Sequence, residues 1–287
     1  MTKMEVNSTN ILLVIIFYHP KEDDWAYVAK MGEKYRGYIV DNSEEEHPYP
    51  QAGQLKYICN HQNLGIAEAQ NIALREAFRQ DDFTHVVFFD QDSRVEMDYP
   101  ERIAKEYESV KHDFPNLAII GPTVKNMATG EKYHSVIHTD HFATDYFIPR
   151  REVISSGSCI DRDSLESVGL NDSKLFIDYV DFEWCWRAES KGYLCGITNN
   201  VTISHQVGKD ELHFPGGYRV ILSAPFRYFY QYRNYIWLSQ RKYVPLQWKL
   251  ATGIKFVVRL LYFPIFVKEG RKRFSYMLQG IKAGLKK

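Results

Sequence analysis

The first 205 or so residues alternate short apolar runs with stretches in which apolar residues recur at helical spacing. The apolar runs are rich in β-branched and aromatic residues and predict strands at Ile11–Phe17, Gly37–Val40, Leu55–Cys59, His85–Phe89 and Leu117–Ile120. Helical spacing predicts helices at Glu22–Lys34, Ile66–Arg79 and Tyr99–Lys111. Strands that alternate with helices are typical of βαβ units. We therefore predict an α/β fold with a Rossmann-type, mainly parallel central sheet flanked by helices.

One predicted strand leads directly into an acidic triplet. Val86–Phe89 is continuously apolar, as in a strand covered on both faces, and Asp90-Gln91-Asp92 follows it. In open α/β sheets the ligand crevice lies beyond the carboxyl ends of the strands. If the chain stays extended, Asp90 and Asp92 point the same way and offer hard oxygen ligands that suit Mg²⁺ or Mn²⁺. The alternative is an acidic loop after a core strand.

Charged residues also mark the start of a further predicted helix. Its apolar stripe consists of Val180, Trp184 and Ala188. Asp181 stands at the start of this helix, where a carboxylate either caps backbone N–H groups or accepts a proton from a hydroxyl nucleophile. Glu183 and Arg187 are spaced i, i+4 in the favourable order, which stabilises a helix with or without any further role.

Other candidate chemistry carries less weight. Between Thr123 and Arg150 the chain is irregular and predicts a loop or short hairpin over the sheet, a candidate lid. Three histidines lie there with no regular element to support a metal site: His134, His138 and His141. The four cysteines have no CxxC or metal-ligand spacing, which is typical of reduced thiols in a cytosolic protein. No apolar segment reaches the roughly 18 residues of a membrane-spanning helix.

Five motifs occur in an order and spacing that resemble those of a known family. They are Val40–Ser43, Asn63–Asn71, Asp90–Asp92, Ser156–Ile160 and Asp181–Arg187. Over roughly residues 10 to 210 the chain resembles the family-two inverting glycosyltransferases with the GT-A fold, and most of all their bacterial rhamnosyltransferase branch. The resemblance implies a GT-A-like sheet domain that transfers a sugar from a nucleotide-sugar donor to a hydroxyl group.

The resemblance implies donor-binding roles for three residues. Asp41 matches the acidic residue that holds the pyrimidine ring, and a carboxylate can accept the ring N3–H of uracil or thymine. Gly65 matches a turn glycine, where the absence of Cβ lets the chain approach the nucleotide. Asn71 matches a residue of the next helix that contributes either packing or a polar contact.

Metal and catalytic roles follow from the same resemblance. Asp90 and Asp92 match the motif that binds Mn²⁺ or Mg²⁺ together with the donor diphosphate, where the ion neutralises the charge of the departing nucleotide. Asp181 matches the general base, and His205 lies where many members supply a further metal ligand. Acceptor contacts or support for the site are expected from Ser156, Gly157, Asp178, Glu183 and Arg187.

Two variants favour a particular donor. Gln70 stands where many members have arginine, and the lead-in Phe176–Asp181 also looks like the rhamnosyl branch. We therefore expect dTDP-L-rhamnose as the donor, with a UDP-sugar as the alternative. A nucleotidyltransferase would share the metal carboxylates but usually carries a glycine-rich phosphate loop after the first strand, unlike Phe17–Pro20 here. A non-catalytic nucleotide-sugar-binding module would need no base at Asp181.

Charge is distributed unevenly along the chain. Of 36 basic and 36 acidic residues, positions 241–287 hold twelve Lys/Arg and one acid, which leaves 24 basic and 35 acidic side chains before them. We predict a catalytic domain at 1–215 and a helical, basic and aromatic extension at 216–287. Basic residues among aromatics suit an anionic membrane surface, and we expect no nucleic-acid binding. The alternative is packing on the body or on a second subunit of a homo-oligomer.

A membrane-facing extension would suit a lipid-linked acceptor, which bacterial rhamnosyltransferases often use. We therefore expect an enzyme in the cytoplasm, peripheral on the inner face of the cell membrane. Its acceptor would be a glycan or a polyprenyl-linked saccharide, and its product a part of cell-surface polysaccharide synthesis.

Overall fold

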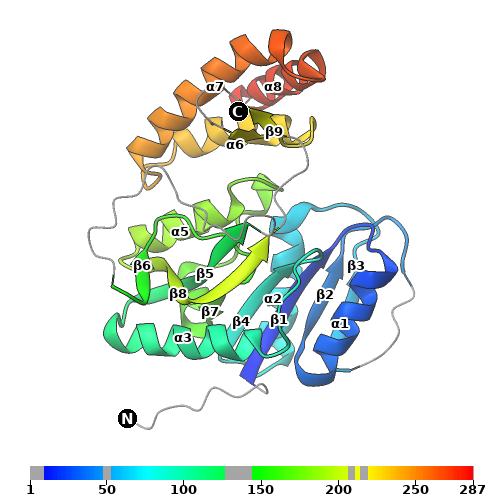
Figure 1. Ribbon diagram of the computed structural model, residues 1–287, viewed down its shortest axis with the longest axis vertical. Helices are drawn as coiled ribbons and strands as arrows, with labels where there is room; N and C mark the ends of the chain where they lie inside the picture. The colour runs from blue at the N-terminus through cyan, green and yellow to red at the C-terminus, as the bar shows by residue number, and fades with distance from the viewer. Residues whose placement is uncertain (1–9, 48–52, 127–143, 206–210, 214–218, 287) are drawn as a thin grey trace.

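One eight-stranded sheet forms the centre of the protein, with helices on both faces (Figure 1). The computed structural model describes residues 10–47, 53–126, 144–205, 211–213 and 219–286. The strand order is β3-β2-β1-β4-β7-β5-β8-β6. The strands are β1 (Ile11–Phe17), β2 (Arg36–Asp41), β3 (Leu55–Cys59), β4 (His85–Asp90), β5 (Leu117–Asn126), β6 (Phe147–Pro149), β7 (Cys159–Asp161) and β8 (Leu194–His205). Parallel pairing joins β3, β2, β1 and β4, and again β5 and β8, so the predicted α/β fold is confirmed.

A short strand interrupts the parallel order near the middle of the sheet. β7 lies between β4 and β5 and runs antiparallel to both, with Cys159 opposite Val87 on one side and Ile120 on the other. Three residues are too few to produce a recognisable alternation, and the sequence did not predict this strand. β7 follows directly on the Ser155–Ser158 turn and thereby brings this turn to the carboxyl end of β4.

The two faces of the sheet are covered by different helices. α1 (Glu22–Lys34) and α3 (Tyr99–Asp113) cover one face; α2 (Gly65–Gln80), α4 (Arg162–Val168) and α5 (Val180–Ser190) cover the other. Successive side chains of β1 alternate between the two cores, with Leu13 in the first and Leu12 and Val14 in the second. Because both faces are covered, every residue of β1 is buried and the strand is an unbroken apolar run.

Most predicted boundaries agree with the structure, and two regions differ. β1, α1 and β3 begin and end at the predicted residues. β5 continues beyond the predicted Ile120 to Asn126, and β6 lies inside the stretch expected to be irregular. The three histidines of that stretch, His134, His138 and His141, lie outside the described residues.

Three helices, which we call the extension, follow the sheet: α6 (Arg227–Ser239), α7 (Leu246–Phe266) and α8 (Gly270–Leu285). They pack around a small apolar core of their own, which includes Tyr228, Tyr232, Phe256, Phe263 and Met277. A second cluster joins the extension to the body, where Leu238 and Val244 pack with Val180 and Trp186 of α5. The extension therefore lies against the helix that carries Asp181.

Two short strands lie between the sheet and the extension: β9 (Glu211–His213) and β10 (Arg219–Ile221) form an antiparallel pair. The predicted boundary between 215 and 216 falls outside the described residues, and the division into two domains stays a prediction. Figure 1 shows the hairpin with the helices of the extension rather than with the large sheet. None of the described helices combines the length and the apolar character needed to cross a membrane.

Candidate active site

The acidic motif after β4 forms a tight turn beyond the carboxyl end of the strand. The backbone N–H of Asp90 donates to Ser93 Oγ over 3.2 Å, and the N–H of Ser93 donates to the Asp90 carbonyl over 3.0 Å. The chain does not stay extended through Asp92, because Gln91 and Asp92 occupy the turn, so the condition under which Asp90 and Asp92 would point the same way is not met. Asp90 is partly buried, whereas Asp92 is exposed. The turn thus presents one carboxylate at the sheet edge and one toward solvent.

The donor set of this turn suits a hard divalent cation. Asp90 and Asp92 supply carboxylate oxygens, and Mg²⁺ sites typically combine one or two carboxylates with waters and substrate phosphates. Within the described residues no group of three or more His, Cys, Asp or Glu side chains could hold a metal without such additional ligands. His205 ends β8, but its side chain lies outside the described part of the chain. Its predicted role as a metal ligand stays a prediction.

The Ser155–Ser158 turn connects the acidic turn to the rest of the site. Ser156 is buried, and its Oγ lies 2.7 Å from Ser93 Oγ. The N–H of Gly157 donates to the carbonyl of Phe88 in β4 over 2.7 Å. Gly157 has φ +78°, and a Cβ there would lie 2.7 Å from the Tyr99 hydroxyl oxygen, so glycine is required. Ser156 and Gly157 thus hold the acidic turn against the sheet, and the acceptor or supporting roles predicted for them stay predictions.

Asp181 lies in the first turn of α5 but is not its N-cap. The N-cap is Tyr179, and Asp181 Oδ1 accepts the backbone N–H of Phe182 over 3.0 Å. Asp181 also lines a small recess with Gln70, Phe88 and Trp184. Burial raises the pKa of the Asp181 carboxyl to about 6; backbone N–H groups oppose the shift, and the negative charge of Asp90 adds to it. Such a carboxylate can accept a proton near neutral pH.

The chain reaches Asp181 through an unusual turn. Phe176, Asp178 and Tyr179 have φ of 65°, 66° and 67°, the left-handed region that non-glycine residues rarely adopt. Such residues cost about 1–3 kcal/mol each and persist where their surroundings over-determine them. The Asp178 carboxylate points to α6, where it accepts from Arg227 Nη2 over 2.7 Å and from Nε over 3.1 Å. Asp178 is thus a supporting residue of this turn.

Gly65 and Asn71 hold the same region from the other side. A Cβ at Gly65 would lie 2.5 Å from the Phe176 carbonyl oxygen, so glycine permits the close approach of this turn. The predicted contact of Gly65 with the nucleotide stays a prediction. Asn71 is buried, and its Nδ2 donates to the Asn171 carbonyl and to Ser173 Oγ, both over 2.9 Å. Its Oδ1 accepts the N–H of Asn171, so Asn71 fastens this loop to α2.

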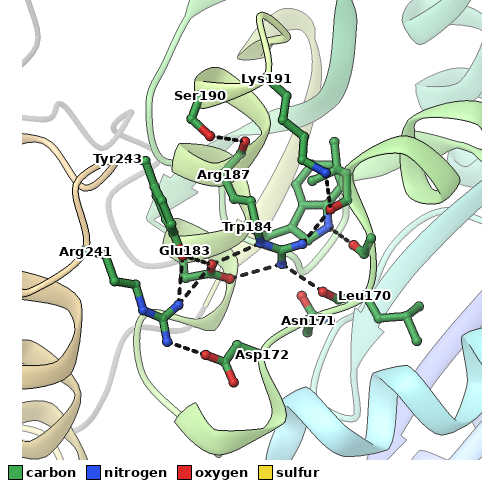
Figure 2. A network of polar contacts seen from close by, with 12 residues as sticks. Leu170, Asn171, Asp172, Glu183, Trp184, Arg187, Ser190, Lys191, Arg241 and Tyr243 are labelled. Carbon is green, nitrogen blue, oxygen red and sulfur yellow. Dashed lines mark hydrogen bonds and ion pairs between the residues drawn. The ribbon is translucent and has the colours of Figure 1, made fainter.

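Glu183 is the centre of a buried polar network (Figure 2). Its side chain is 1% exposed and accepts from Arg187 Nε over 3.0 Å, as the predicted i, i+4 pair requires. It also accepts from Arg241 Nη1 over 3.1 Å and from the Tyr243 hydroxyl over 2.6 Å. Arg241 reaches Asp172 as well. Glu183 and Arg187 therefore join α5 to the extension, and their predicted role in acceptor contact or support stays a prediction.

The carboxylate oxygens of Asp41 already have hydrogen-bond partners within the protein. Its side chain is fully buried, and Oδ1 accepts from the Ser43 N–H over 2.9 Å and from Ser43 Oγ over 2.6 Å. Oδ2 accepts from the Tyr57 hydroxyl over 2.9 Å and lies 2.9 Å from His47 Nδ1. A carboxylate offers about four acceptor sites, and these partners use them. A contact to a pyrimidine N3–H would require one partner to move, and this role stays a prediction.

Sequence reasoning missed the part of the site that lies in the extension. Arg227 and Asn234 of α6 and Arg241 after it contact the loop before Asp181 or the network of Glu183. The available signal was the spacing of polar residues on the buried face of α6, where Gln231 and Asn234 stand among buried aromatics. That pattern indicates a polar target but does not identify it.

Comparison with known proteins agrees with this geometry. The chain is 28% identical over 298 aligned positions to the dTDP-rhamnosyl transferase RfbF of Shigella flexneri. The alignment covers 97% of this chain and 95% of that protein. Among solved structures it resembles GalNAc-T7, crystallised with UDP, GalNAc and Mn²⁺, with a TM-score of 0.56 at 14% identity. This likeness covers 89% of the chain but only 57% of that structure, and it shows the GT-A fold. No protein-family model matches the chain.

Proposed function

We propose that this chain, a glycosyltransferase with the GT-A fold that is similar to dTDP-rhamnosyl transferases, transfers L-rhamnose from dTDP-L-rhamnose to a hydroxyl group with inversion at the anomeric carbon. The similarity to RfbF over nearly the full length supports the donor. The observation that carries the chemistry is Asp181, whose carboxyl has its pKa raised to about 6 beside the acidic turn of Asp90. A UDP-sugar remains the alternative donor.

In this proposal Asp181 acts as the general base of a single displacement. Its carboxylate accepts the proton of the acceptor hydroxyl while the acceptor oxygen forms a bond to the anomeric carbon. The bond from that carbon to the diphosphate oxygen breaks on the opposite face, and its electron pair leaves with the nucleoside diphosphate. General-base assistance of this kind typically contributes about 10²–10⁴ in rate.

Asp90 and Asp92 would hold a Mn²⁺ or Mg²⁺ ion together with the donor diphosphate. When bound, the ion neutralises charge that develops on the departing nucleotide. The exposure of Asp92 leaves its oxygens accessible to a ligand that arrives with the donor. The role of the protein here is to fix both carboxylates in one turn, which Ser93 and Ser156 hold against the sheet.

We further propose that the enzyme works at an anionic membrane surface on a glycan or polyprenyl-linked acceptor in cell-surface polysaccharide synthesis. α7 carries exposed apolar side chains along one line, which we call the α7 stripe: Leu246, Leu250, Ile254, Val257, Leu261 and Ile265. The helix also contains Lys249, Lys255 and Arg259 and no acidic residue. Of the three cations Lys255 is exposed, whereas Lys249 Nζ donates to the Arg241 carbonyl and Arg259 packs over rings of the extension's own core. An exposed apolar stripe on a helix without acidic residues suits insertion among anionic lipid heads.

An assay with a panel of nucleotide-sugars tests the function. The protein is incubated with dTDP-L-rhamnose, UDP-glucose, UDP-GlcNAc and GDP-mannose in Mn²⁺, and release of the nucleoside diphosphate is measured with and without chelator. We expect release from dTDP-L-rhamnose that requires the metal. Release only from a UDP-sugar would select the alternative donor. Binding of a nucleotide-sugar without any release would favour a non-catalytic module. Release of pyrophosphate from a nucleoside triphosphate and a sugar phosphate would favour a nucleotidyltransferase.

A further inference from the structure

We infer that the extension is part of the catalytic apparatus: α6 holds the left-handed turn Phe176–Tyr179 in the shape that aims Asp181, and Asn234 is its central positioning residue. The inference rests on the proposed role of Asp181 as the base. It assigns to α6 a task beyond attachment of the extension to the sheet domain.

Asn234 makes an unusually concentrated set of contacts with this turn. Its side chain is fully buried, and Nδ2 lies 2.9 Å from the carbonyl oxygens of Leu175 and Ile177 and 3.1 Å from that of Asp178. Its Oδ1 accepts from Arg233 Nη2 over 2.9 Å, which orients the amide. One side-chain amide thus contacts three carbonyl groups, one at the end of the short 3-10 helix Ser173–Leu175 and two in the turn that follows it.

Other residues of α6 contact the left-handed residues themselves. Tyr230 stacks on Phe176 with ring centroids 4.6 Å apart and an interplanar angle of 8°. Arg227 makes the bidentate ion pair with Asp178, whose carboxylate also lies 3.4 Å from Gln231 Nε2. Side chains of α6 therefore contact the side chains of two of the three left-handed residues, Phe176 and Asp178. Asn234 contacts the backbone carbonyl of Ile177 between them.

The turn contains no glycine to relieve its left-handed conformation, so its shape depends on these external contacts. Attachment of the extension does not account for them, because the Glu183 network and the packing of Leu238 and Val244 already join the extension to α5. The polar contacts of α6 converge instead on the residues immediately before Asp181. A base must be held in a productive geometry, and a displacement of about 1 Å can cost roughly 10²-fold in rate.

The test compares two substitutions on α6. Asn234→Ala removes the contacts to the turn, and the control Tyr232→Phe removes a buried hydrogen bond of 2.8 Å to the Phe256 carbonyl in α7. Hydrogen exchange of backbone amides is measured by mass spectrometry for both proteins. We expect faster exchange over residues 176–183 in Asn234→Ala and no change there in Tyr232→Phe. Unchanged exchange over 176–183 in Asn234→Ala would overturn the inference, whatever the donor is.

Kinetics of the same proteins provide the second measurement. With dTDP-L-rhamnose and Mn²⁺, water serving as acceptor, Asn234→Ala should lower kcat at least tenfold while the donor KM stays within about twofold. The midpoint of the acidic limb of kcat/KM should fall from about 6 toward the ordinary carboxyl range as water reaches Asp181. A kcat no lower than that of Tyr232→Phe, with an unmoved midpoint, would contradict the positioning role.

Two further variants keep the outcomes separate. If Asn234→Ala does not fold, Arg227→Met makes the same comparison at a partly exposed residue, because it opens the ion pair with Asp178. If Asp181→Asn keeps full turnover, the proposed base is wrong. If Asp181→Asn loses turnover but Asn234→Ala and Arg227→Met both behave like Tyr232→Phe, only the positioning role fails.

Discussion

Two acidic turns contribute to the candidate site, and they are held in different ways. The turn of Asp90 is closed by Ser93, three residues later, through two hydrogen bonds of 3.2 and 3.0 Å. The turn before Asp181 is held by α6, and the ion pair of Asp178 and Arg227 spans 49 positions of the chain. One turn is local and opens Asp92 to solvent, whereas the other is strained and half-buried.

The difference separates two tasks of a transferase. A metal and a charged donor enter and leave in every cycle, so the carboxylates that bind them need access. A base gains most from a fixed position and a low-polarity surrounding, which also raises its pKa. Under the proposed function, the accessible turn of Asp90 is suited to exchange of metal and donor, and the turn before Asp181 to preorganisation of the base.

The contrast is tested most severely by Asp181→Asn. Asparagine keeps the acceptor oxygen for the Phe182 N–H but cannot take a proton, so turnover should fall about 10²–10⁴-fold with donor affinity unchanged. Because the folded-state pKa of Asp181 is raised, ionisation of the carboxyl destabilises the fold as pH rises to about 6. The variant should therefore be at least as stable as the wild type at pH 7.5, measured by thermal unfolding. Loss of stability with full turnover would identify a structural carboxylate instead.

On the donor side, Asp92→Asn should lower metal-dependent turnover by about 10²–10³, because one hard ligand of the ion is lost. The exposed position of Asp92 means that the melting temperature should not change. Asp82→Asn is the matched control, since Asp82 is an exposed acid that precedes β4 as Asp92 follows it. Full activity of Asp92→Asn in chelator would contradict the metal role.

The acidic limb of the pH profile separates the two turns further. Below pH 6 the Asp181 carboxyl is protonated, so kcat/KM should fall about tenfold per pH unit and level off above pH 7. Residual activity of Asp181→Asn should lack this limb, whereas Asp92→Asn should retain it. The measurement is initial rate from pH 4.5 to 8 at saturating Mn²⁺. A limb that survives in Asp181→Asn would belong to another group.

A smaller effect is expected at the membrane. Ile254→Ser in the α7 stripe should weaken the affinity for anionic liposomes about tenfold, as measured by sedimentation. The reason is that an apolar side chain, 67% exposed in the protein, no longer inserts into the lipid. Leu278→Ser in α8 is the control, since Leu278 is 47% exposed and lies outside the stripe. Binding of the wild type should also weaken as salt screens the basic residues. Equal binding to neutral liposomes, or none to either kind, would favour packing on another protein.

Discrimination among nucleotides should be the smallest effect. By calorimetry, dTDP should bind about fourfold more tightly than dUDP, because the two nucleotides differ by one methyl group that becomes buried on binding. GDP should bind more weakly than either, because a purine cannot present the pyrimidine N3–H to Asp41. Preference for GDP would refute both the donor and the role of Asp41, whose present partners already fill its oxygens.

The sequence predicted the local features of this protein and not the distant ones. Strands such as β1 are continuous apolar runs in the sequence, and the acidic turn directly follows another such run in β4. The left-handed conformation of Phe176 and Tyr179 has no local signal, since bulky aromatic residues rarely adopt it. Asn234 contacts the turn from 56 positions away, and nothing in a single sequence pairs these two sites. The structure was needed for the side of the site that depends on tertiary contacts.

The reach of α6 into the turn before Asp181 affects how such enzymes can be recombined. Grafting a foreign extension onto this sheet domain, to redirect it to another surface or acceptor, would separate Asn234 and Arg227 from the carbonyls and the carboxylate that they bind. A functional chimera would have to inherit residues 172–179 and α6 from the same parent. The unit of exchange in this protein is therefore a pair of segments far apart in the gene, rather than one contiguous C-terminal module.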